Sequence, residues 1–81
     1  MNFGHATKLM QDAEGARVRR SGWNGKGMFL FYVKPSDWTL TNGHTDNFPL
    51  LPFIAMKTAD DKIVPWLASQ TDVLASDWET C

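Results

Sequence analysis

Apolar residues near the start of the chain recur with the spacing of one helix face. They are Phe3, Ala6, Leu9, Met10 and Ala13. Asn2 stands where a side chain can cap the first turn, and Gly15 stands where the residue after a helix end belongs. The pattern predicts a helix that begins after Asn2 and ends before Gly15.

The next stretches carry strand patterns. Residues 17–20 alternate weakly, which indicates a short strand with one face in water. Residues 28–33 are an almost unbroken apolar run, typical of a central strand covered on both faces. Residues 52–58 and 62–64 flank a short acidic turn at 59–61, which predicts a hairpin.

The last third of the chain predicts a second, shorter helix. Ser69 and Asp72 fit a capping box in front of Val73 and Leu74. Trp78 and its neighbours suit a last edge strand, whereas the polar residues 35–51 predict a loop. The sum is one small α+β domain over residues 1–81, an antiparallel sheet with an N-terminal helix and a short C-terminal helix.

Size and cysteine content add a prediction about assembly. A chain of 81 residues buries only about 60% of its unfolded surface, so a monomer is marginally stable. Cys81 is the single cysteine, and His5 and His44 lack the spacing of a metal site, so neither disulfides nor a metal supply the deficit. Four tryptophans in so short a chain favour shared aromatic interfaces. We therefore predict a homo-oligomer without cofactor or metal.

Charge limits the partners. The net charge of −1 and the pI of about 6.0 argue against binding of a nucleic-acid polymer. A local basic group could still hold a few phosphates; it comprises Arg17, Arg19, Arg20 and Lys26. Strand alternation places Arg17 and Arg19 on one face and Arg20 on the other. No signal peptide or long apolar run appears, so a cytoplasmic protein without membrane contact is predicted.

The glycine-rich stretch 22–27 is the first candidate ligand site. Trp23 offers a flat face on which a base can stack, Asn24 can pair with a base edge or a ribose, and Lys26 can neutralise a phosphate. The alternative is that Trp23 packs on the protein's own sheet and Lys26 is merely solvated. The stretch has neither the phosphate-loop nor the dinucleotide-binding glycine spacing.

The start of the second predicted helix is another candidate. Its backbone amides can receive an anion, but Ser69 and Asp72 compete for them as caps, which leaves Gln70 and Thr71 freer for a ligand. For Trp66, packing in a core or an interface is the favoured interpretation.

Catalytic chemistry is poorly represented. The histidines have no partner carboxylate or nucleophile nearby in the sequence. Asp60 and Asp61 lie at the predicted hairpin tip, where we expect them to be solvated and unperturbed, and Cys81 has no neighbour in the sequence that would activate it as a nucleophile. The residues therefore indicate a binding protein rather than an enzyme.

Several literal runs resemble a known family. Residues 22–28, 56–60, 64–72 and 77–78 are similar to the second Thoeris anti-defence family, small proteins of phages and prophages. The resemblance covers nearly the whole chain outside residues 35–51. It implies a non-catalytic sponge for cyclic nucleotide immune signals in the cytoplasm of the infected host. The signals are chiefly glycocyclic ADP-ribose made by TIR enzymes, and for some members also CBASS-type cyclic dinucleotides at a separate pocket. It further implies a homotetramer with pockets between subunits.

The resemblance also implies which residues contact the ligand. They are Trp23, Asn24 and Lys26 in the first motif, Met56, Lys57 and Thr58 in the second, and Ser69, Gln70 and Asp72 in the third. Two positions depart from the family pattern: Asp61 stands where glycine is frequent, and His5 replaces a commonly acidic residue. Two alternatives remain open, namely a hydrolase of the same nucleotides that uses Asp72 or His44, and a structural or interaction protein whose aromatics serve assembly.

Overall fold

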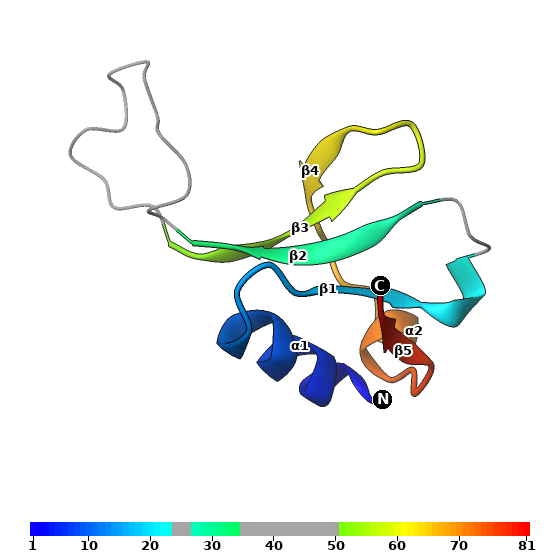
Figure 1. Cartoon of the computed structure of the whole chain (residues 1–81). Coiled ribbons are helices and arrows are strands. Elements are labelled where there is room, and N and C mark those ends of the chain that lie inside the picture. Colours follow the sequence, from blue (N-terminus) through cyan, green and yellow to red (C-terminus); the bar gives the residue numbers. More distant parts are fainter. Residues whose placement is uncertain (24–26, 35–50) are drawn as a thin grey trace, which may run out of the picture.

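A computed structural model describes residues 1–23, 27–34 and 51–81. Within these ranges, five strands form one antiparallel sheet in the order β4-β3-β2-β1-β5, accompanied by two α-helices and one 3₁₀ turn (Figure 1). In chain order the elements are α1 (Phe3–Asp12), β1 (Arg17–Arg20), η1 (Ser21–Trp23), β2 (Phe29–Val33), β3 (Phe53–Lys57), β4 (Ile63–Pro65), α2 (Gln70–Val73) and β5 (Trp78–Thr80). The α+β class and the antiparallel sheet predicted from the sequence are confirmed.

The first helix follows its sequence signals closely. The side chain of Asn2 accepts a hydrogen bond from the His5 amide at 2.8 Å, so the predicted cap is confirmed. The helix ends at Asp12 with Ala13 as its C-cap, and Gly15 comes two residues later with φ of +79° in the turn into β1. Glycine is favoured there because an L-residue with a Cβ is strained at positive φ.

The register of the sheet separates two faces. Val18 lies opposite Leu30, and Leu30 lies opposite Met56, so these three side chains share the face that α1 covers. The buried core on that face comprises Ala6, Met10, Val18, Leu30 and Trp78. The helix layer thus packs on one side of the sheet, as Figure 1 shows.

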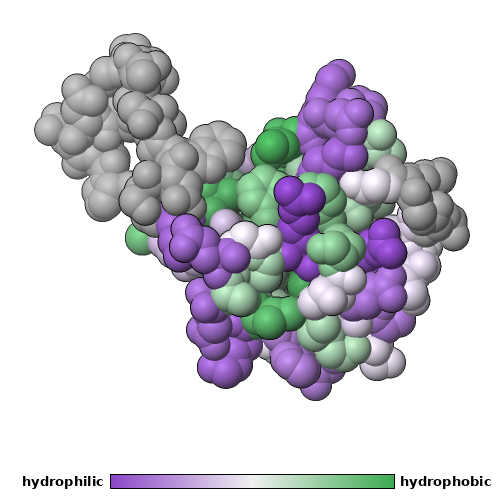
Figure 2. All heavy atoms as spheres, in the orientation of Figure 1, coloured by the Kyte–Doolittle hydropathy of each residue, from purple (hydrophilic) through white to green (hydrophobic). Residues whose placement is uncertain are grey.

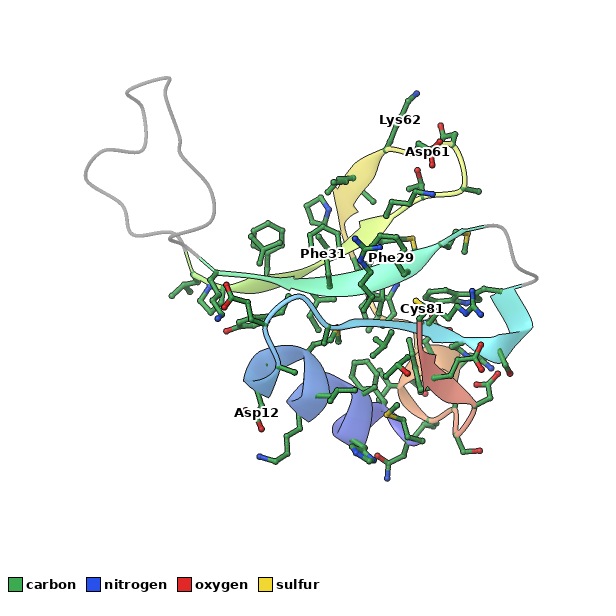
Figure 3. The ribbon with its side chains drawn as sticks, viewed as in Figure 1. Asp12, Phe29, Phe31, Asp61, Lys62 and Cys81 are labelled. Atoms are coloured by element: carbon green, nitrogen blue, oxygen red, sulfur yellow. The ribbon has the colours of Figure 1, made fainter. Side chains whose placement is uncertain are left out.

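The other face of β2 corrects an expectation. The strand is central in the sheet, as predicted, but Phe29 and Phe31 point away from α1 (Figure 3) and stay half-buried. Within the described ranges, no helix covers this face. The apolar run combines Leu30, which is fully buried on the core face, with Val33, which is 1% exposed on the other face beside the two half-buried rings. The prediction that both faces are covered therefore holds at Val33 and is wrong at Phe29 and Phe31.

The hairpin and the edge strands agree with the sequence. The β3–β4 turn closes with the Thr58 amide donating to the Lys62 carbonyl at 2.7 Å. Among the described strands, β5 pairs only with β1, with Arg19 opposite Glu79, so Trp78 begins an edge strand as predicted. Neither helix of the described residues is long and apolar enough to cross a membrane.

Candidate functional site

Three tryptophans meet where η1, α2 and β5 converge, a region that we call the tryptophan corner (Trp23, Trp66 and Trp78). Trp78 is only 2% exposed and packs edge-on against Trp23 and Trp66, with ring centroids 5.6 and 6.0 Å apart. The predicted packing role of Trp66 is confirmed. Trp23 is half-buried against Trp78, so it packs within the domain, and its contact with a ligand stays a prediction.

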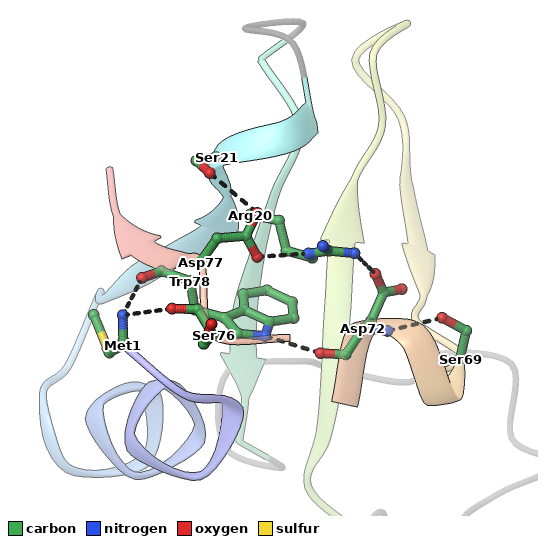
Figure 4. Close-up of polar contacts among 8 residues, drawn as sticks. All are labelled: Met1, Arg20, Ser21, Ser69, Asp72, Ser76, Asp77 and Trp78. Carbon is green, nitrogen blue, oxygen red and sulfur yellow. Dashed lines mark hydrogen bonds and ion pairs between the residues drawn. The ribbon is translucent and has the colours of Figure 1, made fainter. Parts of the chain in front are cut away.

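One arginine ties this corner together (Figure 4). Nε of Arg20 donates to Oδ1 of Asp77 at 2.9 Å, and its Nη1 donates to Oδ1 of Asp72 at 2.9 Å. The hydroxyl of Ser21 donates to the other oxygen of Asp77 at 3.0 Å. The hydrogen bond with Asp77, and then that with Asp72, raises the pKa of Arg20, while the Arg20 guanidinium lowers the pKa of Asp77.

The start of α2 is held by the same network. Ser69 caps the helix by accepting from the Asp72 amide at 3.1 Å, as predicted. The Asp72 carboxylate pairs with Arg20, and the Asp72 carbonyl accepts from the indole nitrogen of Trp78 at 2.9 Å. Asp72 therefore has structural partners on both its side chain and its backbone. Gln70 is exposed at the first position of the helix, and its predicted ligand contact, like those of Ser69 and Asp72, stays a prediction.

Neighbouring residues of the second motif lie on opposite faces of the sheet. Met56 packs against the core, whereas Lys57 lies on the opposite face. The Lys57 ammonium donates to the Gly27 carbonyl at 3.0 Å and pairs with Asp61. Gly27 has φ of +74°, and a Cβ there would lie 3.1 Å from the Lys57 nitrogen, so glycine suits both the backbone and the contact.

The β3–β4 turn contains Thr58 and an ordered carboxylate. The Thr58 hydroxyl donates to Asp60, and this hydrogen bond is the main reason that the pKa of Asp60 is lowered. The expectation that Asp60 is unperturbed is therefore wrong, because a side-chain hydroxyl inside the turn stabilises its ionised form. Of the predicted ligand residues, Asn24 and Lys26 lie outside the described residues.

A hollow of about 440 Å³ opens on the other side of the molecule. Its lining comes from the end of α1, the following turn and the open face of the sheet, and it reaches Met10 and Tyr32 of the core side at the edge of the hollow. We call it the sheet-face hollow, lined by Met10, Glu14, Gly15, Ala16, Arg17, Phe29, Phe31, Tyr32, Lys34, Lys57 and Ile63. The register explains the grouping, because Arg17 lies opposite Phe31, Phe29 opposite Lys57, and Lys57 opposite Ile63.

Aromatic rings and a cation meet in this hollow. The guanidinium carbon of Arg17 lies 4.5 Å from the ring centroid of Phe29, which in turn lies 6.0 Å from the ring of Phe31. Both rings stand on the face away from the helices (Figure 3), and Figure 2 shows strongly hydrophilic atoms among apolar ones over the central strands. Such a surface suits a ligand with a flat apolar part and a negative charge.

Of the ligand contacts predicted from the sequence motifs, one lines the hollow, namely Lys57. Arg17 was a candidate phosphate ligand from charge alone, but Phe29 and Phe31 were assigned to a covered strand. The signal that could have found them is the two-residue alternation inside the apolar run, read together with a basic neighbouring strand. Among the residues that the structure describes, no group of three or more histidine, cysteine or acidic side chains could hold a metal.

These observations define a small α+β protein with one antiparallel sheet, a helix-covered core face and an open face that combines cations with aromatic rings. The chain belongs to the Thoeris anti-defense 2-like domain family, whose match extends over residues 1–81. It is similar to Thoeris anti-defense 2 of Bacillus phage SP01, with 46% identity over 84 residues, which cover 98% of this chain and 92% of the phage protein. The family resemblance inferred from the sequence runs is thereby confirmed.

Proposed function

We propose that this protein is a phage anti-defence sponge that binds cyclic nucleotide immune signals in the cytoplasm of the infected host and releases them unchanged. The observation that carries the proposal is the family match along all 81 residues, together with a phage relative that is named for anti-defence against Thoeris. Glycocyclic ADP-ribose is the proposed main ligand, and CBASS-type cyclic dinucleotides are proposed as additional ligands.

The sheet-face hollow supports a binding function. Its volume lies within the range of roughly 300–1,000 Å³ that is usual for small-molecule sites. Phe29 and Phe31 offer apolar surface to a base or a sugar, and Arg17 offers a guanidinium to a phosphate. The tryptophan corner supports the same function in a different way, because Trp23 packs against Trp78 and Ser21 is bonded to Asp77, contacts that favour a preformed position of the Trp23 ring.

Sequestration requires tight binding. A sponge that competes with an immune effector needs a dissociation constant near the nanomolar range, about −12 kcal/mol. A preformed site reaches such affinity more readily than a site that must be ordered on binding. We propose that subunits of a homotetramer complete the pockets and keep them rigid. Two exposed leucines beside α2 suit such contacts, Leu67 at 92% and Leu74 at 80% exposure.

The proposal is tested by binding and recovery. The protein is incubated with excess glycocyclic ADP-ribose, freed of unbound ligand by gel filtration, denatured by heat, and the released compound is identified by mass spectrometry. We expect intact ligand in a fixed ratio to protein; a parallel sample with cyclic di-GMP measures the proposed second specificity. Conversion beyond one molecule per subunit would instead indicate a hydrolase. A stable oligomer that retains neither compound would indicate a protein whose aromatics serve assembly alone.

A further inference from the structure

The basic side chains in the described part of the chain differ in whether they pair with a carboxylate. Five of them pair with carboxylates within the described ranges: Lys8, Arg19, Arg20, Lys57 and Lys62. Arg17 differs, because in the described part of the chain its guanidinium reaches no carboxylate and lies over the Phe29 ring instead. Arg17 is also exposed at the hollow, so its charge is available to an incoming anion.

The contact with Phe29 prepares Arg17 for that role. A guanidinium that packs its carbon against a ring is held in place by a cation–π interaction. A guanidinium presents its N–H groups in a planar fork, which matches the geometry of phosphate oxygens and can bind them in a bidentate manner. The Phe29 ring therefore orients the cation without neutralising it.

The neighbours of Arg17 favour a phosphorylated ligand. Phe31 lies directly opposite Arg17 in the register, so an apolar ring and the cation stand side by side on the same face. The lining also includes Lys34, Lys57 and one acidic residue, Glu14. Asp61 already compensates Lys57, which leaves Arg17 as the better placed of these two cations for a phosphate.

We propose that Arg17 is the phosphate-binding residue of the sheet-face hollow, and that Phe29 positions its guanidinium while Phe31 contacts the base or sugar. This inference rests on the proposed function, because it takes the ligand to be a cyclic nucleotide. It adds the residue that makes the hollow prefer a phosphorylated compound to an uncharged nucleoside.

The test compares two arginines of one strand. Arg19 lies two residues from Arg17 on the same face of β1, but it is paired with Glu79 at 3.0 Å, so Arg19→Ala is the matched control. Titration calorimetry with glycocyclic ADP-ribose is carried out on the wild-type protein, Arg17→Ala, Arg17→Lys and Arg19→Ala. We expect Arg17→Ala to bind at least about tenfold more weakly, since a charge-assisted hydrogen bond is worth about 1.5–3 kcal/mol. Arg19→Ala should stay within about twofold of wild type, and Arg17→Lys should fall between.

A measurement on the wild-type protein tests the role of Arg17 even if the variants fail to fold. Phenylglyoxal modifies accessible arginines, and mass spectrometry after digestion reports each site separately. Glycocyclic ADP-ribose should protect Arg17 and leave the modification of Arg19 as it is without ligand. If the wild-type protein binds the nucleotide but Arg17→Ala matches Arg19→Ala and no protection is seen, the role of Arg17 is refuted while the sponge stands. If the wild-type protein binds neither glycocyclic ADP-ribose nor cyclic di-GMP, the proposed function fails and this inference with it.

Discussion

The tryptophan corner and the sheet-face hollow both combine aromatic rings with an arginine, but they differ in the partners of their polar groups. In the corner, Arg20 is shared by two carboxylates and the indole nitrogen of Trp78 donates to a carbonyl, so the polar groups have partners inside the protein. In the hollow, Arg17 contacts the face of Phe29 and pairs with no carboxylate of the described residues, and both phenylalanines remain partly exposed.

Because of this difference, we expect the corner to contribute mainly to the stability of the fold and the hollow mainly to ligand binding. The corner stabilises the fold, because Trp78 at its centre is buried and the donor of its indole has an acceptor. An aromatic surface with an uncompensated cation gains little inside the free protein but can gain much on contact with a nucleotide. Substitutions in the two regions should therefore change different measured quantities.

The largest effect is expected from Trp78→Ala. Trp78 is 2% exposed and contacts Phe3, Trp23 and Trp66, so truncation leaves a cavity among three rings and removes a hydrogen bond. Such substitutions cost about 3–5 kcal/mol, which is most of the stability of a small domain. Denaturation in urea should show this loss. A loss below about 1 kcal/mol would mean that the corner does not support the fold.

Much of this corner and its fold followed from the sequence. Asn2 and Ser69 cap their helices because short polar side chains at those positions bond to nearby amides, a local effect that a single sequence displays. The predicted capping box formed only in part, because Asp72 pairs with Arg20, which is 52 residues away. A long-range ion pair of this kind has no local sequence signal.

The hollow was harder to predict for a related reason. An apolar run such as residues 28–33 indicates a central strand, but it does not tell which face receives a helix. That choice depends on where α1 packs, and thus on Val18, Leu30 and Trp78 being buried together. The open face with Phe29 and Phe31 is what remains after this packing.

Phe31→Ala should have the opposite profile to Trp78→Ala. The Phe31 ring is half-buried in the hollow, so we expect a modest loss of stability. Loss of a stacking surface costs about 1–3 kcal/mol of binding energy, which is roughly five- to 150-fold in affinity for glycocyclic ADP-ribose. Calorimetry and urea denaturation on the same sample measure both quantities. The control is Leu51→Ala, which removes a 75% exposed apolar side chain that does not line the hollow and should leave affinity unchanged. Equal affinities in the two variants would argue against the hollow as the binding site.

The ion pairs of the corner predict a dependence on pH. Because Arg20 holds the pKa of Asp77 below its ordinary value of 3.8, the folded protein favours the ionised carboxylate more than the unfolded chain does. The stabilisation is therefore complete above that ordinary value and is lost as the pH falls through the lowered one. We expect the melting temperature of wild type to drop more steeply between about pH 4 and pH 2 than that of Asp77→Asn.

A second lowered carboxylate provides the comparison for this experiment. The pKa of Asp60 is lowered mainly by Thr58 in the β3–β4 turn, far from Arg20 in the sequence. Asp60→Asn should remove its own part of the acid sensitivity and leave the part due to Asp77 intact. If Asp77→Asn and wild type lose stability in parallel, the Arg20 network does not contribute to acid stability.

The smallest effect is expected in the β3–β4 turn, with Asp61→Gly. Asp61 has φ of +64°, where glycine is free of the strain that a Cβ causes, but glycine also gives the unfolded chain more freedom. We expect a net gain below about 1 kcal/mol in the free energy of unfolding, measured by urea denaturation, because these terms nearly offset one another.

The substitution also releases Lys57 from its ion pair at the rim of the hollow, so nucleotide affinity at low salt should rise by a few-fold. Asp61→Asn separates the two causes: it removes the charge and keeps a side chain at positive φ, so it should reproduce the gain in affinity without the gain in stability. An affinity that is unchanged in both variants would show that Lys57 lies too far from the bound phosphate to matter.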